Sequence, residues 1–280
     1  MKKLACVNGK IVPLDKAVVS VLDYGLLYGF GVFETMRAYN NRVFKMEEHL
    51  GRLEKSCKKV GIKVNLNAVG NSVKKLLIAN RLKNAYIRVT LTYGVGKPRL
   101  AFGRQKTTFI VIADSLPENL SVKQKRGVRA GFSRVRHYSG LLLNQIKSTN
   151  YLQTALRKKE ARERRLDDVI ILNEKNNVVE ASTSNIFIVD KKDRLITPRL
   201  QDGCLPGITR KTVLQIARRL KIKTIEKTIK PKELLNAKEI FITNSIMEII
   251  PVRQAEKKEF KKRAITRRLQ AEYKRQTKQP

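Results

Sequence analysis

The chain has few of the residue types on which metal and disulfide frameworks depend. It contains only two histidines and three cysteines among its 280 residues, and it also has no tryptophan. His49 and His137 are too few for a histidine-rich metal site, so we expect no metal. The cysteines lie far apart, form no CxxC pair and are odd in number. This pattern argues against a disulfide framework and fits a reducing cytoplasm.

Long hydrophobic runs are also missing. No window of the sequence approaches about 18 continuous apolar residues, which is the length that a membrane-spanning helix needs. The first residues are charged but lack an apolar segment long enough for a signal peptide. We therefore predict a cytoplasmic protein that has no membrane partner.

Acidic residues are scarce, and their scarcity gives the chain an extreme charge. There are 24 Asp and Glu residues against 60 Lys and Arg, so the formal net charge is +36. Such a balance is typical of nucleic-acid binders, and the basic segment 257–275 keeps that alternative open. However, the cations are spread over the whole length, and no zinc-finger spacing or RNA-binding aromatic signature accompanies them. Nucleic acid is therefore not the partner we expect, and a small anionic substrate fits the charge equally well.

The length and pattern of the chain predict an α+β fold in two parts. Hydrophobic residues make up 42% of the sequence, enough for a packed core. A looser, polar stretch that contains Pro117 marks a boundary. We place a small N-terminal domain at 1–115, a linker at 116–127 and a larger C-terminal domain at 128–280. Helices and strands mix without a strict βαβ alternation, which favours α+β over a doubly wound sheet.

Periodicity and turn residues predict the individual elements. Asn8-Gly9 predicts a tight hairpin turn, and Asn40-Asn41 predicts a second turn. Alternating or β-branched runs predict strands at 32–39, 85–93, 107–113, 128–132, 168–172, 185–189 and 239–243. Helical spacing predicts helices at 46–60, 67–80, 149–163, 209–220 and 258–274.

One lysine stands out because of the residues that follow it at long range. Lys147 lies in the run Gln145-Ile-Lys-Ser-Thr-Asn-Tyr-Leu, just ahead of the predicted helix at 149–163. Glu180 comes 33 residues later, at the end of a predicted strand. An amine, a carboxylate and several small hydroxyl or glycine turns are what a site for pyridoxal phosphate (PLP) requires. A catalytic lysine must also spend part of its time uncharged in order to move protons.

Two small-residue turns and one arginine are candidates for binding a phosphate. Gly207-Ile208-Thr209 leads directly into a predicted helix, and the unpaired N–H groups of a helix N-terminus attract anions. Thr243-Asn244-Ser245 follows a predicted strand and adds further donors. Arg52 adds a guanidinium, which binds phosphate well.

These residues together resemble the class IV PLP-dependent aminotransferases, also called fold type IV. The motifs that carry the resemblance are Tyr28-Gly-x-Gly-Val-Phe-Glu-Thr, His49-x-x-Arg-Leu, Lys147-Ser-Thr-Asn, Glu180-Ala-x-x-Ser-Asn-Ile-Phe, Gly207-Ile-Thr-Arg and Glu248-x-x-Pro-Val. The resemblance implies that Lys147 bonds to PLP and that Glu180 holds the ring nitrogen. It implies that Arg52, Ile208, Thr209 and Ser245 bind the phosphate. It also implies a cofactor in the cleft between a smaller and a larger domain, a small-molecule amino substrate and a homodimer.

Within this family the residues favour 4-amino-4-deoxychorismate lyases. Branched-chain aminotransferases typically have glycine where this chain has Thr35, and a Gly-Gly-Asn-Tyr run one residue further from the lysine. D-Amino acid aminotransferases typically hold the substrate carboxylate with a tyrosine, an arginine and a histidine. Here Phe33 replaces the tyrosine, Arg99 is the candidate for the arginine, and Ala101 stands in the histidine's place.

The lyases share the Lys-x-x-Asn spacing, the threonine and an Asn-small-x-Met run that matches Asn244-Ser245-Ile246-Met247. The lyase resemblance implies release of pyruvate and formation of 4-aminobenzoate for folate synthesis. Thr35 would act beside Lys147, and Phe33, Arg99 and Ile246 would contact the substrate. Amino acid transamination, of branched-chain or D-amino acids, is the alternative.

Overall fold

The structure is a computed structural model, and it describes residues 3–103 and 105–278. The described chain forms two compact units. The first contains the residues up to Leu116 together with the short segment Ile146–Asn150, and the second contains Pro117–Gln145 together with the residues from Tyr151 onward. The predicted linker at 116–127 includes helix α4 (Leu120–Arg126), which belongs to the second unit. Whether the two units are domains with the predicted bounds stays a prediction.

The first unit is built on a six-stranded antiparallel sheet. The order of its strands is β2-β1-β6-β5-β3-β4. Their bounds are β1 (Leu4–Val7), β2 (Lys10–Pro13), β3 (Gly31–Tyr39), β4 (Arg42–Val43), β5 (Ala85–Thr92) and β6 (Thr108–Asp114). Both predicted turns are confirmed. Asn8 and Gly9 have positive φ angles of 51° and 85°, and Asn40 and Asn41 have φ angles of 47° and 68°, as two-residue hairpin turns require.

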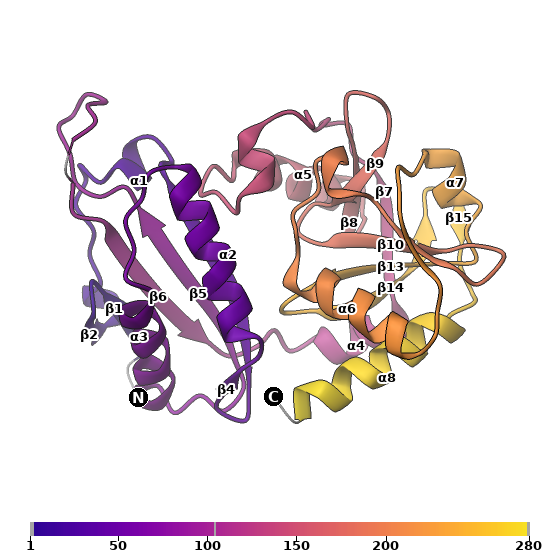
Figure 1. The fold of residues 1–280 in the computed structure, drawn as a ribbon, viewed down its shortest axis with the longest axis horizontal. Coiled ribbons are helices and arrows are strands. Elements are labelled where there is room, and N and C mark those ends of the chain that lie inside the picture. Colours follow the sequence, from indigo (N-terminus) through magenta and orange to yellow (C-terminus); the bar gives the residue numbers. More distant parts are fainter. Residues whose placement is uncertain (1–2, 104, 279–280) are drawn as a thin grey trace. The chain divides into compact units, whose positions relative to one another are not determined.

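Two helices cover one face of this sheet. Helices α2 (Met46–Lys59) and α3 (Leu66–Ala79) lie against it in Figure 1. Their apolar residues, including Leu53 and Leu76, are fully buried with Met36 and Ile87 of the sheet. Burial of each such side chain contributes roughly 1.5–3 kcal/mol, so this layer forms the core of the unit. A one-turn helix, α1 (Tyr24–Leu27), and a 3₁₀ turn, η1 (Leu14–Lys16), precede β3.

The segment around Lys147 differs from its prediction. A helix was expected from residue 149, but α5 (Leu152–Glu163) begins three residues later. Residues 146–150 run beside β3 instead. Phe33 N–H donates to Lys147 O at 2.8 Å, Ser148 pairs with Val32, and Thr149 N–H donates to Gly31 O at 2.9 Å. These hydrogen bonds to a strand far away in sequence override the local helical tendency, and they fix the backbone of Lys147 in the first unit.

The second unit is built on a nine-stranded mixed sheet. The main path is β12-β11-β10-β13-β14-β7-β8-β9, and β15 pairs with β14 off this path. The bounds are β7 (Val128–Phe132), β8 (Asp168–Leu172), β9 (Val178–Ala181), β10 (Asn185–Val189), β11 (Leu195–Thr197), β12 (Thr224–Glu226), β13 (Glu239–Asn244), β14 (Glu248–Ala255) and β15 (Lys258–Glu259). A tight turn, in which Ala181 pairs with Ser184, joins β9 directly to β10.

Helices α6 and α8 pack beside this sheet. Their bounds are α6 (Ile208–Arg219) and α8 (Ala264–Lys278), and a short α7 (Pro231–Leu235) and two 3₁₀ turns, η2 (Leu142–Gln145) and η3 (Leu200–Asp202), complete the unit. The terminal helix was predicted from residue 258 and begins six residues later. The buried side chain of Phe260 and the hydrogen bond from Phe260 N–H to Arg253 O hold this stretch against β14.

The predicted α+β class is confirmed, since helices and strands mix without a regular alternation. Among the described residues, no helix combines the length and the apolar character that crossing a bilayer requires.

Candidate active site

In the first unit, Lys147 lies against the ring of Phe33. The lysine Nζ is 4.3 Å from the ring centre, and Phe33 itself is buried. Phe33 belongs to β3, and its N–H also bonds the Lys147 carbonyl. Backbone and side chain therefore hold the amine at one defined place beside the strand.

A second cation contacts the same ring. The guanidinium carbon of Arg88, on β5, is 3.7 Å from the ring centre of Phe33. Arg88 pairs with Thr35 across β3 and β5, and Thr35 lies two residues from Phe33 on the same face of the sheet. This face, which α2 and α3 do not cover, thus carries an amine, a guanidinium and a hydroxyl around one aromatic ring. A guanidinium in such a place suits a carboxylate.

Arg88 was not among the residues predicted from the sequence. The signal was present, because Tyr86, Arg88 and Thr90 alternate with Ile87 and Val89. Alternation of this kind places the three polar residues on the face opposite to the core. With 60 basic residues in the chain, however, only the contact with Phe33 distinguishes this arginine.

On the other face of β3, Arg52 is bound to a buried carboxylate. Its Nε and Nη2 donate to Glu34 Oε1 and Oε2 at 2.7 and 2.8 Å, and His49 Nδ1 lies 2.7 Å from Glu34 Oε2. Glu34 is fully buried. Burial alone would raise the pKa of Glu34, but Arg52 and His49 outweigh it and hold that pKa at about 2. The glutamate is therefore ionised, and it fixes the plane of the Arg52 guanidinium.

Arg99 lies apart from these residues in the sheet. It is exposed in the loop that follows β5, and its carbonyl accepts a hydrogen bond from the hydroxyl of Tyr24 at 3.1 Å. The structure fixes the backbone of this loop without bringing the Arg99 side chain into a described contact.

In the second unit, Glu180 is held at the end of β9. Its Oε2 accepts hydrogen bonds from Asn185 Nδ2 and from Leu205 N–H, both at 3.2 Å. The same Asn185 amide donates to Leu205 O at 2.8 Å. Asn185 therefore ties the carboxylate to the segment that leads into α6. Its position in the motif was recognised from the sequence, but its role as the connection was not.

The N-terminus of α6 presents unpaired backbone donors. The helix starts at Ile208, Gly207 provides no side-chain cap, and the Lys211 N–H bonds Gly207 O at 3.0 Å. The N–H groups of the first turn have no partner within the helix by its geometry. Ile208 and Thr209 are both buried. A Cβ on Gly207 would lie 2.0 Å from Asn185 Oδ1, so close packing requires glycine here.

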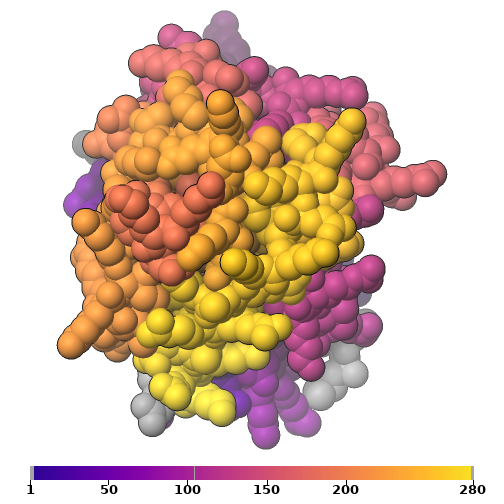
Figure 2. Space-filling view, turned by 90° about the vertical axis from the view of Figure 1, so that its right-hand side faces the viewer, coloured from indigo at the N-terminus to yellow at the C-terminus, as the bar shows by residue number. Residues whose placement is uncertain are grey.

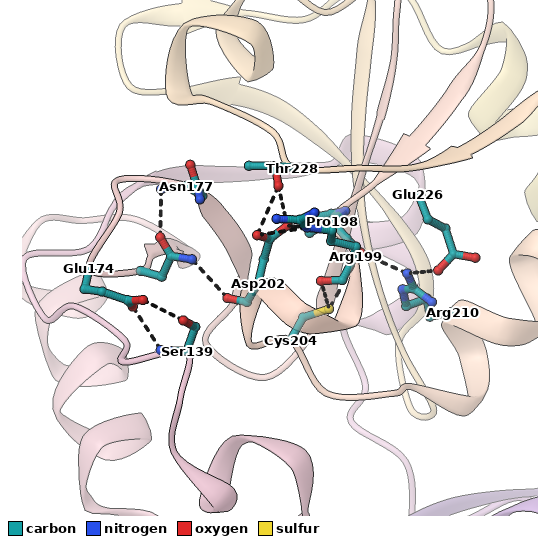
Figure 3. A network of polar contacts seen from close by, with 11 residues as sticks. Ser139, Glu174, Asn177, Pro198, Arg199, Asp202, Cys204, Arg210, Glu226 and Thr228 are labelled. Atoms are coloured by element: carbon teal, nitrogen blue, oxygen red, sulfur yellow. Dashed lines mark hydrogen bonds and ion pairs between the residues drawn. The ribbon is translucent and has the colours of Figure 1, made fainter.

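A network of polar contacts fixes the segment before α6 (Figure 3). Asp202 accepts hydrogen bonds from Thr228 Oγ1 at 3.1 Å, and Arg210 Nη2 donates to Pro198 O at 2.9 Å and to Glu226 at 2.7 Å. The Cys204 thiol points to the carbonyls of Pro198 and Arg199, and burial raises the pKa of Cys204 to about 12. This thiol stays protonated near neutral pH and serves packing.

Asn244 orders the turn between β13 and β14. Its Oδ1 accepts from Ile246 N–H at 3.0 Å and from Met247 N–H at 2.8 Å, and its Nδ2 donates to Thr183 O and Ser184 Oγ. The turn that carries Ser245 and Ile246 is thereby tied to the turn that follows Glu180. Within the second unit, hydrogen bonds thus connect the turn after Glu180 both to the segment that leads into α6 and to the turn of Ser245 and Ile246.

Comparisons with known proteins identify the family of the chain. Residues 31–255 match the family described as amino-transferase class IV. The chain belongs to the class IV aminotransferase family.

Its similarity to individual members extends over most of the sequence. It is 40% identical over 252 residues to a putative branched-chain-amino-acid aminotransferase of Methanocaldococcus jannaschii. The aligned region covers 88% of this chain and 85% of that protein. It is 33% identical to the aminodeoxychorismate lyase of Bacillus subtilis over 89% of this chain and 86% of that protein. The PLP-form structure of a branched-chain amino acid aminotransferase from Thermobaculum terrenum matches with a TM-score of 0.89 and 27% identity, over 99% of this chain and 94% of that one.

Class IV aminotransferases are PLP enzymes of fold type IV, and the predicted fold, enzyme class and cofactor are confirmed. The residues present fit this cofactor. Lys147 offers an amine, Glu180 a fixed carboxylate, and the first turn of α6 a set of N–H donors. Thr243, beside the turn of Ser245, has a buried hydroxyl that lacks a hydrogen-bond partner in the part of the chain that the structure describes. The role of each residue toward PLP remains a prediction.

Proposed function

We propose that this class IV enzyme is an amino acid aminotransferase that uses glutamate and 2-oxoglutarate as one of its substrate pairs. The observation that carries the proposal is the position of Arg88, which shares the Phe33 ring with Lys147. A carboxylate bound by the Arg88 guanidinium would lie near the amine that moves the proton. Both members of the glutamate pair carry a second carboxylate for which a guanidinium fork is suited.

The cofactor is proposed to be PLP, bound by the residues that the sequence predicts. Lys147 would bond to its aldehyde, and Glu180 would hold the proton on its ring nitrogen. The N–H groups of Ile208 and Thr209, the Ser245 hydroxyl and Arg52 would bind its phosphate, since a helix N-terminus and a guanidinium both favour anions. PLP, when bound, supplies an aldehyde that joins to amines and a ring that withdraws electrons from the carbon beside the amine.

The chain's own residues would then supply positioning and proton transfer. Lys147, displaced by the incoming amine, would take the proton from the substrate carbon and later return it, so its amine must be uncharged when it acts as a base. Arg88 would orient the substrate through its carboxylate, and the buried ring of Phe33 would exclude water on this side of Lys147.

Branched-chain amino acids are the first donors to test. The Methanocaldococcus jannaschii relative is named as a putative branched-chain enzyme. D-Amino acids are less favoured, because Phe33 takes the place of the tyrosine expected for them and Arg99 lies in an exposed loop.

The lyase activity is the second candidate, and Thr35 favours it. Its hydroxyl lies on the same face as Phe33, opposite Arg88, where a branched-chain enzyme is expected to have glycine. The turn built by Asn244, with Ser245 and Ile246, matches the run expected for aminodeoxychorismate lyases, and the Bacillus subtilis relative is named as such a lyase. In the lyase reaction, Lys147 would remove the proton from the ring of the substrate as pyruvate leaves.

One pair of assays separates the two candidates. Purified holoenzyme is incubated with Leu, Ile, Val or D-Ala plus 2-oxoglutarate, and separately with aminodeoxychorismate in the absence of any oxo acid. Glutamate formation from the branched-chain donors without 4-aminobenzoate supports the aminotransferase. Formation of 4-aminobenzoate and pyruvate without an acceptor, and no glutamate, would replace it with the lyase.

We also propose a homodimer. Val18, Leu26 and Phe102 of the first unit are 77%, 67% and 69% exposed, and a contiguous patch of such side chains would mark an interface. Light scattering after gel filtration measures the mass directly. A mass of one chain at micromolar concentration would contradict the dimer.

A further inference from the structure

A cluster of arginines stands at the start of α8 in the second unit. The guanidinium of Arg263 is fixed by hydrogen bonds from Nη1 to Lys125 O at 2.7 Å and from Nη2 to Arg126 O at 2.9 Å. A Cβ on Gly127 would lie 3.3 Å from both Arg253 Cβ and Arg263 Nη2, so these two arginines are neighbours. Arg267 follows one helical turn after Arg263 and bonds to it through the backbone.

This cluster has no anion to balance it. In the part of the chain that the structure describes, no carboxylate pairs with Arg126, Arg253, Arg263 or Arg267, and the buried Arg253 Nε has no hydrogen-bond partner. Burial and repulsion from Arg267 and Arg253 hold the pKa of Arg263 below its usual value. Uncompensated repulsion of this kind would be relieved by a bound anion.

The positive charge continues along the whole of α8. The exposed face of the helix carries Arg267, Arg268, Lys274, Arg275 and Lys278. The apolar residues Ile265, Leu269 and Tyr273 on its opposite face are buried. Figure 2 shows the C-terminal segment that includes α8 in yellow, on the surface of this side of the molecule.

Few acidic groups face this helix, and they are already engaged. Glu239 accepts hydrogen bonds from Ile265 N–H, Thr266 N–H and Thr266 Oγ1 at the helix start. Glu272 forms ion pairs with Arg219 (Nη2 to Oε1, 3.8 Å) and with Arg275 (Nη1 to Oε2, 3.2 Å). The surface formed by Arg126, Arg253, Arg263 and the cations of α8, which we call the α8 basic surface, therefore keeps a strong positive potential.

We propose that the α8 basic surface binds the phosphodiester backbone of nucleic acid without reading its sequence. From Arg267 to Lys278 the helix rises about 16 Å, which equals the rise of about five phosphates of one strand along the duplex axis. A single small anion would not use such a length. The surface is also rigid, because Gln270 Nε2 donates to Gln124 O and Ile249 O and so fastens α8 to α4 and β14.

A membrane is the less suitable partner. Interfacial helices bind lipid by inserting their apolar face, and the apolar face of α8 is buried inside the protein. This proposal is independent of the aminotransferase proposal, since none of its residues belongs to the candidate active site.

The test measures binding of the holoenzyme to a short fluorescein-labelled DNA duplex of random sequence by anisotropy over a range of KCl concentrations. R267E/R268E changes the α8 basic surface. The control K74E/K75E makes the same change in net charge at two exposed lysines of α3 in the first unit. Both variants should keep the wild-type melting temperature and PLP content, because all four side chains are exposed.

The wild-type protein and K74E/K75E should bind with a steep dependence on salt. R267E/R268E should bind at least tenfold more weakly, and its slope of log affinity against log salt should be smaller by about 2, since each phosphate contact contributes about 0.9. Equal losses in both variants would mean diffuse attraction and overturn the proposal. So would absent binding at low salt, or binding to anionic lipid vesicles but not to the duplex.

Discussion

Arg52 Nε and Nη2 donate side by side to the two carboxylate oxygens of Glu34, at 2.7 and 2.8 Å, deep in the first unit. His49 completes the group at 2.7 Å from the same carboxylate. A guanidinium held in this way cannot rotate freely, so the entropy cost of ordering it is already met before a ligand arrives. Glu34 is thus a positioning residue for Arg52, which in turn is a proposed phosphate ligand.

The first prediction follows from that role. E34Q keeps the shape of the side chain but removes its charge, so Arg52 should lose its fixed orientation and PLP should bind roughly tenfold more weakly, as expected for one charged hydrogen bond. Titration of the apoenzyme with PLP, followed by fluorescence, measures the affinity. E54Q, at a partly exposed glutamate of α2, the helix that carries Arg52, is the control. Unchanged affinity in E34Q would show that Glu34 does not act through Arg52.

The second prediction concerns acid stability. The folded-state pKa of Glu34 is about 2, below its ordinary 4.5. The ionised group therefore stabilises the fold above pH 4.5, and this contribution, on the order of 3 kcal/mol, is lost as the pH falls toward 2. Urea unfolding at pH 6 and pH 3 should show a larger loss of unfolding free energy for the wild-type apoenzyme than for E34Q. Equal losses in the two proteins would contradict this assignment.

Local patterns allowed much of the secondary structure to be predicted, and long-range contacts decided the rest. The turns at Asn8-Gly9 and Asn40-Asn41 depend on side chains that tolerate positive φ, so the sequence alone reveals them. The local pattern around Lys147 predicts a helix, but this segment is hydrogen-bonded to β3, which lies more than a hundred residues earlier in the sequence. No local signal encodes such a pairing.

The residues of the candidate site also differ in whether local sequence or long-range contacts reveal them. Motif spacing identified Lys147 and Glu180, because their residue types are chemically specific. Arg88 was missed because arginine is abundant here, and only its packing on Phe33 marks it. Asn185 and Asn244 were quoted within motifs, yet their function as connections between turns depends on distances that only the folded chain defines.

The third prediction tests the packing at the start of α6. Gly207→Ala would place a methyl group 2.0 Å from Asn185 Oδ1, so Asn185 or the helix must move. We expect a loss of roughly 1–3 kcal/mol in unfolding free energy and weaker PLP binding, measured by thermal unfolding and PLP titration. Gly51→Ala is the matched control, because nothing lies within 4 Å of its Cβ in α2. A G207A protein as stable as G51A would contradict the role given to Gly207.

The fourth prediction tests the attachment of the cofactor. Borohydride reduction of the holoenzyme should leave PLP covalently bound to the peptide that contains Lys147, as detected by mass spectrometry. Lys147→Ala should lose this mass, the visible absorbance of lysine-bound PLP and all turnover, because the amine both holds the cofactor and moves the proton. Lys159→Ala, an exposed lysine on α5, should retain all three. Labelling of another lysine in the wild-type protein would remove Lys147 from its proposed role.

The fifth prediction separates carboxylate recognition from catalysis. In R88K the charge remains, but the planar fork that can bind a carboxylate through two nitrogens is lost. A charged hydrogen bond is worth about 1.5–3 kcal/mol, so the KM for glutamate and 2-oxoglutarate should rise roughly 10- to 100-fold. The PLP content and the kcat with saturating substrates should change little, because Arg88 does not move a proton. R81K, at a residue outside the strands of the first unit, is the control. Should kcat fall while KM stays constant, Arg88 would act on the reacting centre and not on the substrate's second carboxylate.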